Sequence, residues 1–185
     1  MINPENQTAR TWKGEGMNHQ EKEALRFQDI HSTAIIGDGT KVYNFVYIGE
    51  YVEIGENCLI ANFVHIDHDV KISHNSKILS MVHIPEYTKV GSSCVIYPNT
   101  CLSNEKYPPT GKKVDLIIED NCIVGSGSII NAGVRLGEGC VVGAGSLVTK
   151  NVAPRTVVFG HPAHRQYSRE DYDKKQKEFL SRIPK

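Results

Sequence analysis

The chain has no excess of either charge and no long apolar run. Its 185 residues include 21 basic and 21 acidic side chains, so no bulk charge attracts nucleic acid or a membrane surface. No uninterrupted apolar stretch approaches the thickness of a bilayer, and the polar start lacks the apolar core of a signal peptide. We therefore expect a single domain that lies in the cytoplasm and contacts neither nucleic acid nor membrane.

Cysteine is scarce and its number, five, is odd, which argues against a disulfide framework. Four of the five stand at small, inward-facing positions of the repeat described below, where a thiol packs as a compact hydrophobic group. These four are Cys58, Cys94, Cys122 and Cys140. We expect them to be reduced and buried, as is usual in cytoplasmic proteins.

What the sequence does have is a period of six. Every sixth residue is aliphatic over a long stretch, and the residue two places earlier is small or β-branched. The aliphatic positions are Ile36, Val42, Ile48, Ile54, Ile60, Ile66, Ile72, Ile78, Ile84, Val90, Ile96 and Leu102, then in a shifted frame Ile118, Val124, Ile130, Leu136, Val142 and Val148. Six residues suit one short strand and one tight corner, so three repeats make a triangular coil and the whole series makes about six coils.

This pattern resembles the hexapeptide-repeat acyltransferases, whose fold is a left-handed parallel β-helix. The resemblance covers about residues 31–165 and implies an all-β fold in which residues eighteen apart lie in one column on neighbouring coils. Residues 1–30 contain no repeat, and we expect a polar extension there with a short helix at 18–27. Residues 166–185 begin with a capping pattern at Ser168 and are expected to form a helix that shields the last coil.

The period breaks between Leu102 and Ile118, so residues 103–115 are expected to leave the coil as a loop. The loop begins Ser103-Asn104-Glu105-Lys106-Tyr107-Pro108. This segment resembles the Thr-Asn-Asp-Lys-Tyr-Pro stretch of bacterial N-acetyltransferases that modify 3-amino sugars on UDP or dTDP. The resemblance implies that Asn104 lies beside the reacting amine and that Lys106 and Tyr107 bind the acceptor. Taken by itself, an asparagine here is equally typical of a turn.

Two histidines eighteen residues apart, His65 and His83, are expected to stack on the outer surface. Three interpretations stay open: surface or subunit-interface residues, a catalytic base in the acceptor pocket, or zinc ligands. Tyr47 and Cys101 extend the column on either side; a zinc site would need a third ligand beside the two histidines, and no metal is expected. His68, Glu86 and Asn104 form a neighbouring column, which we expect to lie beside the acceptor.

The later coils are rich in small residues. Ser126 and Ala144 stand eighteen apart, in stretches that resemble those with which the family holds acyl-CoA. The resemblance implies that their backbone amides contact the pantetheine arm of acetyl-CoA, with cationic side chains beyond them on the phosphates. The candidate donor-binding residues are Gly125, Ser126, Gly143, Ala144, Lys150 and Arg165.

The loop contains no histidine, which favours an amine acceptor, because a free amine attacks a thioester with little basic help whereas a hydroxyl needs a base. We therefore expect acetyl-CoA-dependent N-acetylation of a nucleotide-linked amino sugar, for surface polysaccharide synthesis. Sugar O-acetylation through His65 or His83 stays open. A γ-carbonic anhydrase has the same coil, but its Gly-His-x-x-x-x-His element is absent; a non-catalytic scaffold is a further alternative. The resemblance also implies a homotrimer with active sites between subunits.

Overall fold

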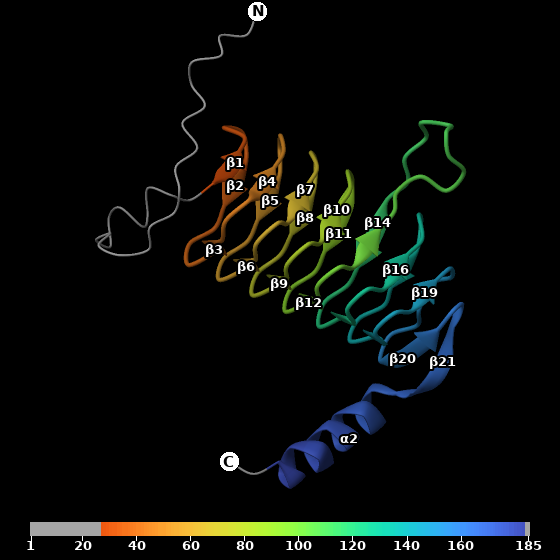
Figure 1. The fold of residues 1–185 in the computed structure, drawn as a ribbon. Coiled ribbons are helices and arrows are strands. Elements are labelled where there is room, and N and C mark those ends of the chain that lie inside the picture. Colours follow the sequence, from red (N-terminus) through yellow and green to blue (C-terminus); the bar gives the residue numbers. More distant parts are fainter. Residues whose placement is uncertain (1–26, 184–185) are drawn as a thin grey trace, which may run out of the picture.

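The chain winds into a parallel β-helix, as the period of six predicts. The structure is a computed structural model that describes residues 27–183. Short strands, most of them two residues long, alternate with tight turns, and every third strand stacks on the strand one coil earlier. Three sheets result, and Figure 1 shows them as a stack of triangular coils. This confirms the all-β solenoid and is consistent with a left-handed β-helix.

Each sheet forms one side of the prism. The first sheet contains β1 (Gln28–Ile30), β4 (Val46–Ile48), β7 (His65–Ile66), β10 (His83–Ile84), β13 (Cys101–Leu102), β16 (Ile129–Ile130) and β19 (Leu147–Val148). The second contains β2 (Ile35–Ile36), β5 (Glu53–Ile54), β8 (Lys71–Ile72), β11 (Thr88–Val90), β14 (Leu116–Ile118) and β17 (Arg135–Leu136). The third contains β3 (Lys41–Val42), β6 (Leu59–Ile60), β9 (Lys77–Ile78), β12 (Val95–Ile96), β15 (Ile123–Val124), β18 (Val141–Val142), β20 (Thr156–Gly160) and, antiparallel at its edge, β21 (Ala163–Ser168).

The core is the inside of the prism. In a two-residue strand one side chain points outward and the next inward; in β7, for example, His65 is exposed while Ile66 is completely buried. The small positions face inward at the corners, where Ser76 donates its hydroxyl to the carbonyl of Gly91 at 2.7 Å. Cys58, Cys94, Cys122 and Cys140 occupy the same kind of position, buried and free, as predicted.

The predicted loop is also present. Before it, paired residues lie eighteen apart, as in His65 opposite His83; across it they lie 28 apart, as in Cys101 opposite Ile129. The coil therefore resumes in register after the insertion. Residues 103–115 project from the stack between β13 and β14 (Figure 1).

The solenoid has about seven coils rather than the six predicted. Ile30 in β1 adds a strand before the first predicted repeat, so the β-helix begins at Gln28 instead of residue 31. At the other end Val152 pairs with Leu136, and Val158 in β20 pairs with Val142. The helix predicted at 18–27 lies, except for its last residue, outside the described residues.

The C-terminal helix α2 (Arg169–Arg182) begins where predicted, since the Ser168 hydroxyl accepts the backbone N–H of Asp171 at 3.1 Å. It does not shield the last coil: none of its residues is buried, and it points away from the stack (Figure 1). The β20–β21 hairpin extends the third sheet instead. Across the described part of the chain, no helix combines the length and apolarity needed to cross a membrane.

Two corners flank the first sheet. The loop corner joins the first sheet to the second and comprises residues 31–33, 49–51, 67–69, 85–87, 103–115, 131–133 and 149–151. The Phe/Gly corner joins the third sheet to the first and comprises residues 43–45, 61–63, 79–81, 97–99, 125–127 and 143–145. The outer face of the first sheet lies between these two corners.

Candidate functional site

The outer face of the first sheet carries the predicted histidine column. Tyr47, His65, His83 and Cys101 are successive partners on β4, β7, β10 and β13. The Tyr47 and His65 rings are stacked with their centroids 4.5 Å apart, and the His83 ring meets His65 edge-on at 5.3 Å. The prediction that both histidines stack on one side of the prism is confirmed.

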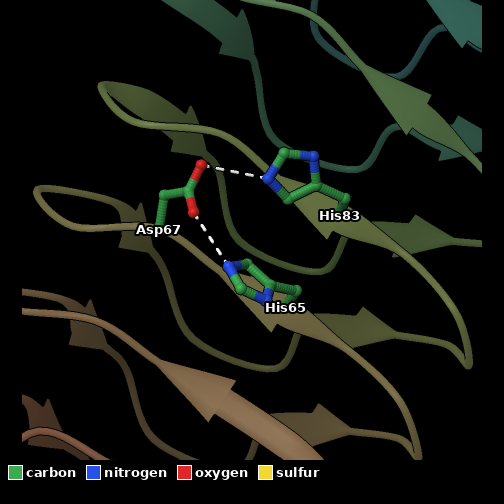
Figure 2. Close-up of side chains that lie close together, drawn as sticks. All are labelled: His65, Asp67 and His83. Carbon is green, nitrogen blue, oxygen red and sulfur yellow. Dashed lines mark hydrogen bonds and ion pairs between the residues drawn. The ribbon is translucent and has the colours of Figure 1, made fainter.

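A residue that sequence reasoning missed, Asp67, joins the two histidines. Its Oδ1 lies 3.0 Å from His65 Nε2 and its Oδ2 lies 3.0 Å from His83 Nε2, so one carboxylate contacts both rings (Figure 2). Asp67 stands at the loop corner, two residues after His65, and is therefore on the same side of the coil as the histidine. The spacing of two residues from His65 was the signal in the sequence that could have placed Asp67 beside the histidine column.

The second predicted column is also present at the loop corner. His68 Nε2 lies 3.6 Å from Glu86 Oε1, and the Asn104 amide donates to the Glu86 carbonyl at 3.3 Å. His68 Nδ1 lies 2.8 Å from Asp69. The hydrogen bond to Asp69, followed by the charge of Glu86, raises the pKa of His68 above its usual value.

Asn104 itself is buried, with 6% of its surface exposed. Its backbone carbonyl accepts the N–H of Val114 at 2.8 Å, which closes the base of the loop. With its amide held by Glu86, the side chain lies beneath the loop and is not among the residues that line the cleft described next. Its predicted contact with a reacting amine stays a prediction.

A cleft of about 560 Å³ opens at the loop corner, lined by both chain neighbours of Asn104, Ser103 and Glu105. Lys106 from the loop and Lys150 from the last coil line it, together with Ser103, Asn131 and Thr149. A second hollow of about 290 Å³ shares Lys150 and includes Arg165. Lys150 therefore lines one hollow with Lys106 and the other with Arg165, whereas Tyr107 is 71% exposed and lines neither space.

Glu105, also at the cleft, shapes the loop. Its carboxylate accepts the backbone N–H of Gly111 at 2.6 Å and the hydroxyl of Thr110 at 3.1 Å. These bonds, with Gly111 first, lower the pKa of Glu105. A glutamate reaches across the loop where the resembling segment has an aspartate, and its charge is turned toward the backbone.

The small residues predicted to hold the donor lie at the Phe/Gly corner. Gly125 and Gly143 are required by stacking: a Cβ on Gly125 would lie 2.5 Å from the backbone nitrogen of Ala144, and one on Gly143 would lie 2.7 Å from Phe159. Ser126 and Ala144 are exposed there. Within one chain, the first sheet separates them from the cleft that contains Lys106 and Lys150.

Two repeat families match the chain on either side of the loop. The bacterial transferase hexapeptide family (six repeats) matches residues 33–68, and the hexapeptide repeat of succinyl-transferase matches residues 115–150. Both matches coincide with coils of the solenoid. Fold and repeats thus define the class: a hexapeptide-repeat β-helix protein.

Curated relatives match over part of their length. A 2,3,4,5-tetrahydropyridine-2,6-dicarboxylate N-acetyltransferase of Ligilactobacillus salivarius is 50% identical over 56 residues, which are 30% of this chain and 23% of that protein. The protein of that name from Halalkalibacterium halodurans is 42% identical over 74 residues, 40% of this chain and 30% of the relative. The chain therefore spans about a quarter to a third of these relatives.

Solved structures match over nearly the whole chain. An aspartate-to-alanine mutant of AntD, an N-acyltransferase from Bacillus cereus in complex with dTDP and coenzyme A, superimposes with a TM-score of 0.67 at 21% identity, covering 90% of this chain and 98% of AntD. UDP-N-acetylglucosamine acyltransferase of Arabidopsis gives a TM-score of 0.52 at 16% identity, covering 81% and 69%. At these identities the likeness establishes the fold. Together with the two repeat matches, it shows a β-helix built from hexapeptide repeats on both sides of the loop.

Proposed function

We propose that the protein transfers an acetyl group from acetyl-CoA to the amine of a nucleotide-linked amino sugar. The partial relatives are named N-acetyltransferases, and the matched AntD structure contains coenzyme A and dTDP. These names support acyl transfer from CoA in general and a nucleotide-sugar acceptor in particular. Synthesis of surface polysaccharide is the pathway to which such a product would belong.

The cationic cleft at the loop corner is the observation that carries the proposal. Lys106 and Lys150 line one space, and Lys150 lines the next together with Arg165. The carboxylate of Glu105, which also lines the cleft, accepts the backbone N–H of Gly111. Two lysines in the cleft and an arginine in the adjoining hollow, with the charge of Glu105 held toward the backbone of the loop, favour a ligand that carries several phosphates. Both CoA and a nucleotide sugar are ligands of this kind.

The pantetheine arm would run along the Phe/Gly corner. Gly127 and Gly145 lie there in the left-handed backbone region, and a Cβ on either would meet no atom within 4 Å. A thin ligand can therefore lie close to the backbone amides of Ser126 and Ala144. These residues and the cationic cleft stand at opposite edges of the first sheet, so we propose a homotrimer in which the cleft of one chain faces the Phe/Gly corner of the next.

In the proposed reaction the neutral amine attacks the thioester carbon, the C–N bond forms and the C–S bond breaks. The thiolate of CoA accepts the proton that the amine releases, so no strong protein base is needed. Backbone N–H groups of the corners stabilise the negative oxygen of the tetrahedral intermediate. We propose that Asn104, with Lys106 and Tyr107, presents the amine, and that His68 and Glu86 border the acceptor.

The test is a thiol-release assay with acetyl-CoA and a panel of UDP- and dTDP-linked amino sugars. Each amino sugar is paired with the sugar that has a hydroxyl at the same carbon. We expect release with at least one amine and none with its hydroxyl partner; no release across the panel would refute the proposal. Lys150→Ala should raise the KM for acetyl-CoA about tenfold. Lys77→Ala, an exposed lysine on the third sheet, is the matched control and should leave KM unchanged.

Sugar O-acetylation is a second candidate because one observation favours it. A carboxylate that accepts a ring N–H from a histidine fixes the tautomer, which leaves the other ring nitrogen free to take a proton. Asp67 could orient His65 or His83 in this way. In the same assay, release only with the hydroxyl sugars, lost in His83→Ala or His65→Ala, would establish O-acetylation.

The cellular setting is part of the proposal. All five cysteines are free, and acetyl-CoA and nucleotide sugars are made in the cytoplasm, so we propose that the enzyme acts there. Separating cytoplasmic from periplasmic extract and probing for the protein would test this directly.

A further inference from the structure

The cluster of His65, Asp67 and His83 has no role in the proposed N-acetylation. The sequence suggested only two stacked imidazoles, and two ligands do not make a metal site. The structure supplies a third ligand, because Asp67 turns toward the column from the loop corner. All three side chains come from two adjacent strands of a rigid sheet and the turn that follows the first (Figure 2).

Their ligand atoms converge. Both Nε2 atoms lie 3.0 Å from the carboxylate, and all three groups offer a ligand atom within 4.8 Å of the others. A tetrahedral ion with bonds of about 2.1 Å keeps its ligand atoms about 3.4 Å apart. The largest gap to close is therefore at most about 1.4 Å, a small rotation for histidine side chains that are about half exposed.

Their chemistry selects the ion. Two imidazoles and one carboxylate suit borderline divalent ions such as Zn²⁺ or Co²⁺, whereas Mg²⁺ and Ca²⁺ prefer a shell of oxygens. The Tyr47 ring packed against His65 restricts that ring, so part of the entropy of ordering it is already lost. We infer that His65, Asp67 and His83 bind one divalent transition-metal ion on the outer face of the first sheet, with its remaining positions open to solvent.

The neighbouring histidine shows what a non-binding arrangement looks like. His68 also contacts two carboxylates, but it uses opposite ring nitrogens, Nδ1 toward Asp69 and Nε2 toward Glu86. Groups on opposite sides of one ring cannot share an ion. His68→Ala is therefore a matched control for the removal of an exposed histidine.

The test is metal binding by the tag-free, full-length chain after chelator treatment. Zn²⁺ affinity is measured in competition with a chromogenic chelator, and Co²⁺ is followed by its visible absorption, which reports coordination geometry. We expect one ion per chain. His65→Ala, His83→Ala and Asp67→Asn should each weaken binding at least about tenfold, and His68→Ala should not change it.

Absence of saturable binding, or binding that all three variants retain, would overturn the inference. Circular dichroism of each variant checks that it is folded, so that a lost site is not confused with a lost structure. The readout is independent of acetyl transfer, so either proposal can fail without the other. A bound ion would also exclude the histidines as the base of O-acetylation, since their Nε2 atoms and Asp67 would be ligands.

Discussion

The coils before and after the loop build the Phe/Gly corner with the same backbone conformation, but the early coils place large side chains there and the late coils place glycine. Phe45, Phe63 and Met81 occupy its left-handed position in the early coils, with φ of 58°, 60° and 60°. After the loop, Gly127 and Gly145 occupy it with φ of 66° and 67°. A residue with a Cβ costs about 1–2 kcal/mol in this conformation, yet the early coils accept that cost at each turn.

In the early coils the strained residues form a column of stacked aromatic rings. Phe27, Phe45 and Phe63 stack in parallel with centroids 5.4 and 4.9 Å apart, and Phe45 and Phe63 are more than half exposed. Such pairs contribute about 0.5–1.5 kcal/mol each, which offsets most of the strain. Since this fold tolerates phenylalanine at the turn, glycine in the late coils is not a backbone requirement there. It keeps the corner bare, as the proposed path of the pantetheine arm requires.

The first way to sharpen this comparison is to separate the two kinds of glycine in the late coils. Gly125→Ala should lower the free energy of unfolding by about 3 kcal/mol, because its Cβ would lie 2.5 Å from the Ala144 backbone. Gly127→Ala should lower it by only about 1 kcal/mol, since it meets only left-handed strain. Urea denaturation measures both. Equal losses would mean that stacking does not distinguish the two positions.

The second is to carry the early side chain into the late corner. Gly145→Phe should raise the KM for acetyl-CoA at least about tenfold, because the ring fills the open space along the proposed pantetheine path. Gly145→Asn is the control, as asparagine adopts left-handed turns and its side chain is short. An unchanged KM in Gly145→Phe would show that acetyl-CoA does not bind along this corner.

The third is the reverse exchange. Phe63→Asn relieves strain but loses the stack with Phe45, so the free energy of unfolding should change by less than about 1 kcal/mol in either direction. Ile66→Ala, three residues on and fully buried, should cost about 2–5 kcal/mol. If Phe63→Asn were as damaging as Ile66→Ala, the aromatic column would belong to the core of the single chain.

The sequence was sufficient wherever geometry follows from the period of six. Columns such as His65 over His83, and the loop that shifts the register, depend only on counting residues, because stacked coils leave no freedom of register. Counting failed at both ends of the solenoid. Ile30 is six residues before Ile36, but the residue two places before it is the polar Gln28 rather than a small one. Val152 lies only four residues after Val148, so it and Val158 are out of the frame of six. There, tertiary pairing rather than the local pattern extends the solenoid.

The directions of individual side chains and their packing partners could not be predicted from the sequence. Asp67 turns toward the column through a rotamer that spacing does not determine, and Asn104 is buried because the loop closes over it. The helical pattern at the C-terminus predicted α2, but a periodic apolar face does not say what it packs against. Lys150 and Arg165 were predicted together for the donor and Lys106 separately for the acceptor, and only the fold shows that Lys150 lines one hollow with Lys106 and the next with Arg165.

The smallest expected effect concerns charge, and it too separates the early coils from the late ones. In the column of Asn104, an early coil carries His68 and the last coil carries Lys150. Because the pKa of His68 is raised in the folded state, its charge stabilises the fold below its unfolded pKa of about 6.5, and this contribution is lost as pH rises through the folded value. The side chain is 46% exposed, so the effect should stay below about 0.5 kcal/mol. Urea denaturation of wild type and His68→Gln between about pH 5 and pH 8 should give a difference that is largest at low pH and fades upward. A difference that grows with pH would mean that the neutral ring is the form that Asp69 and Glu86 stabilise.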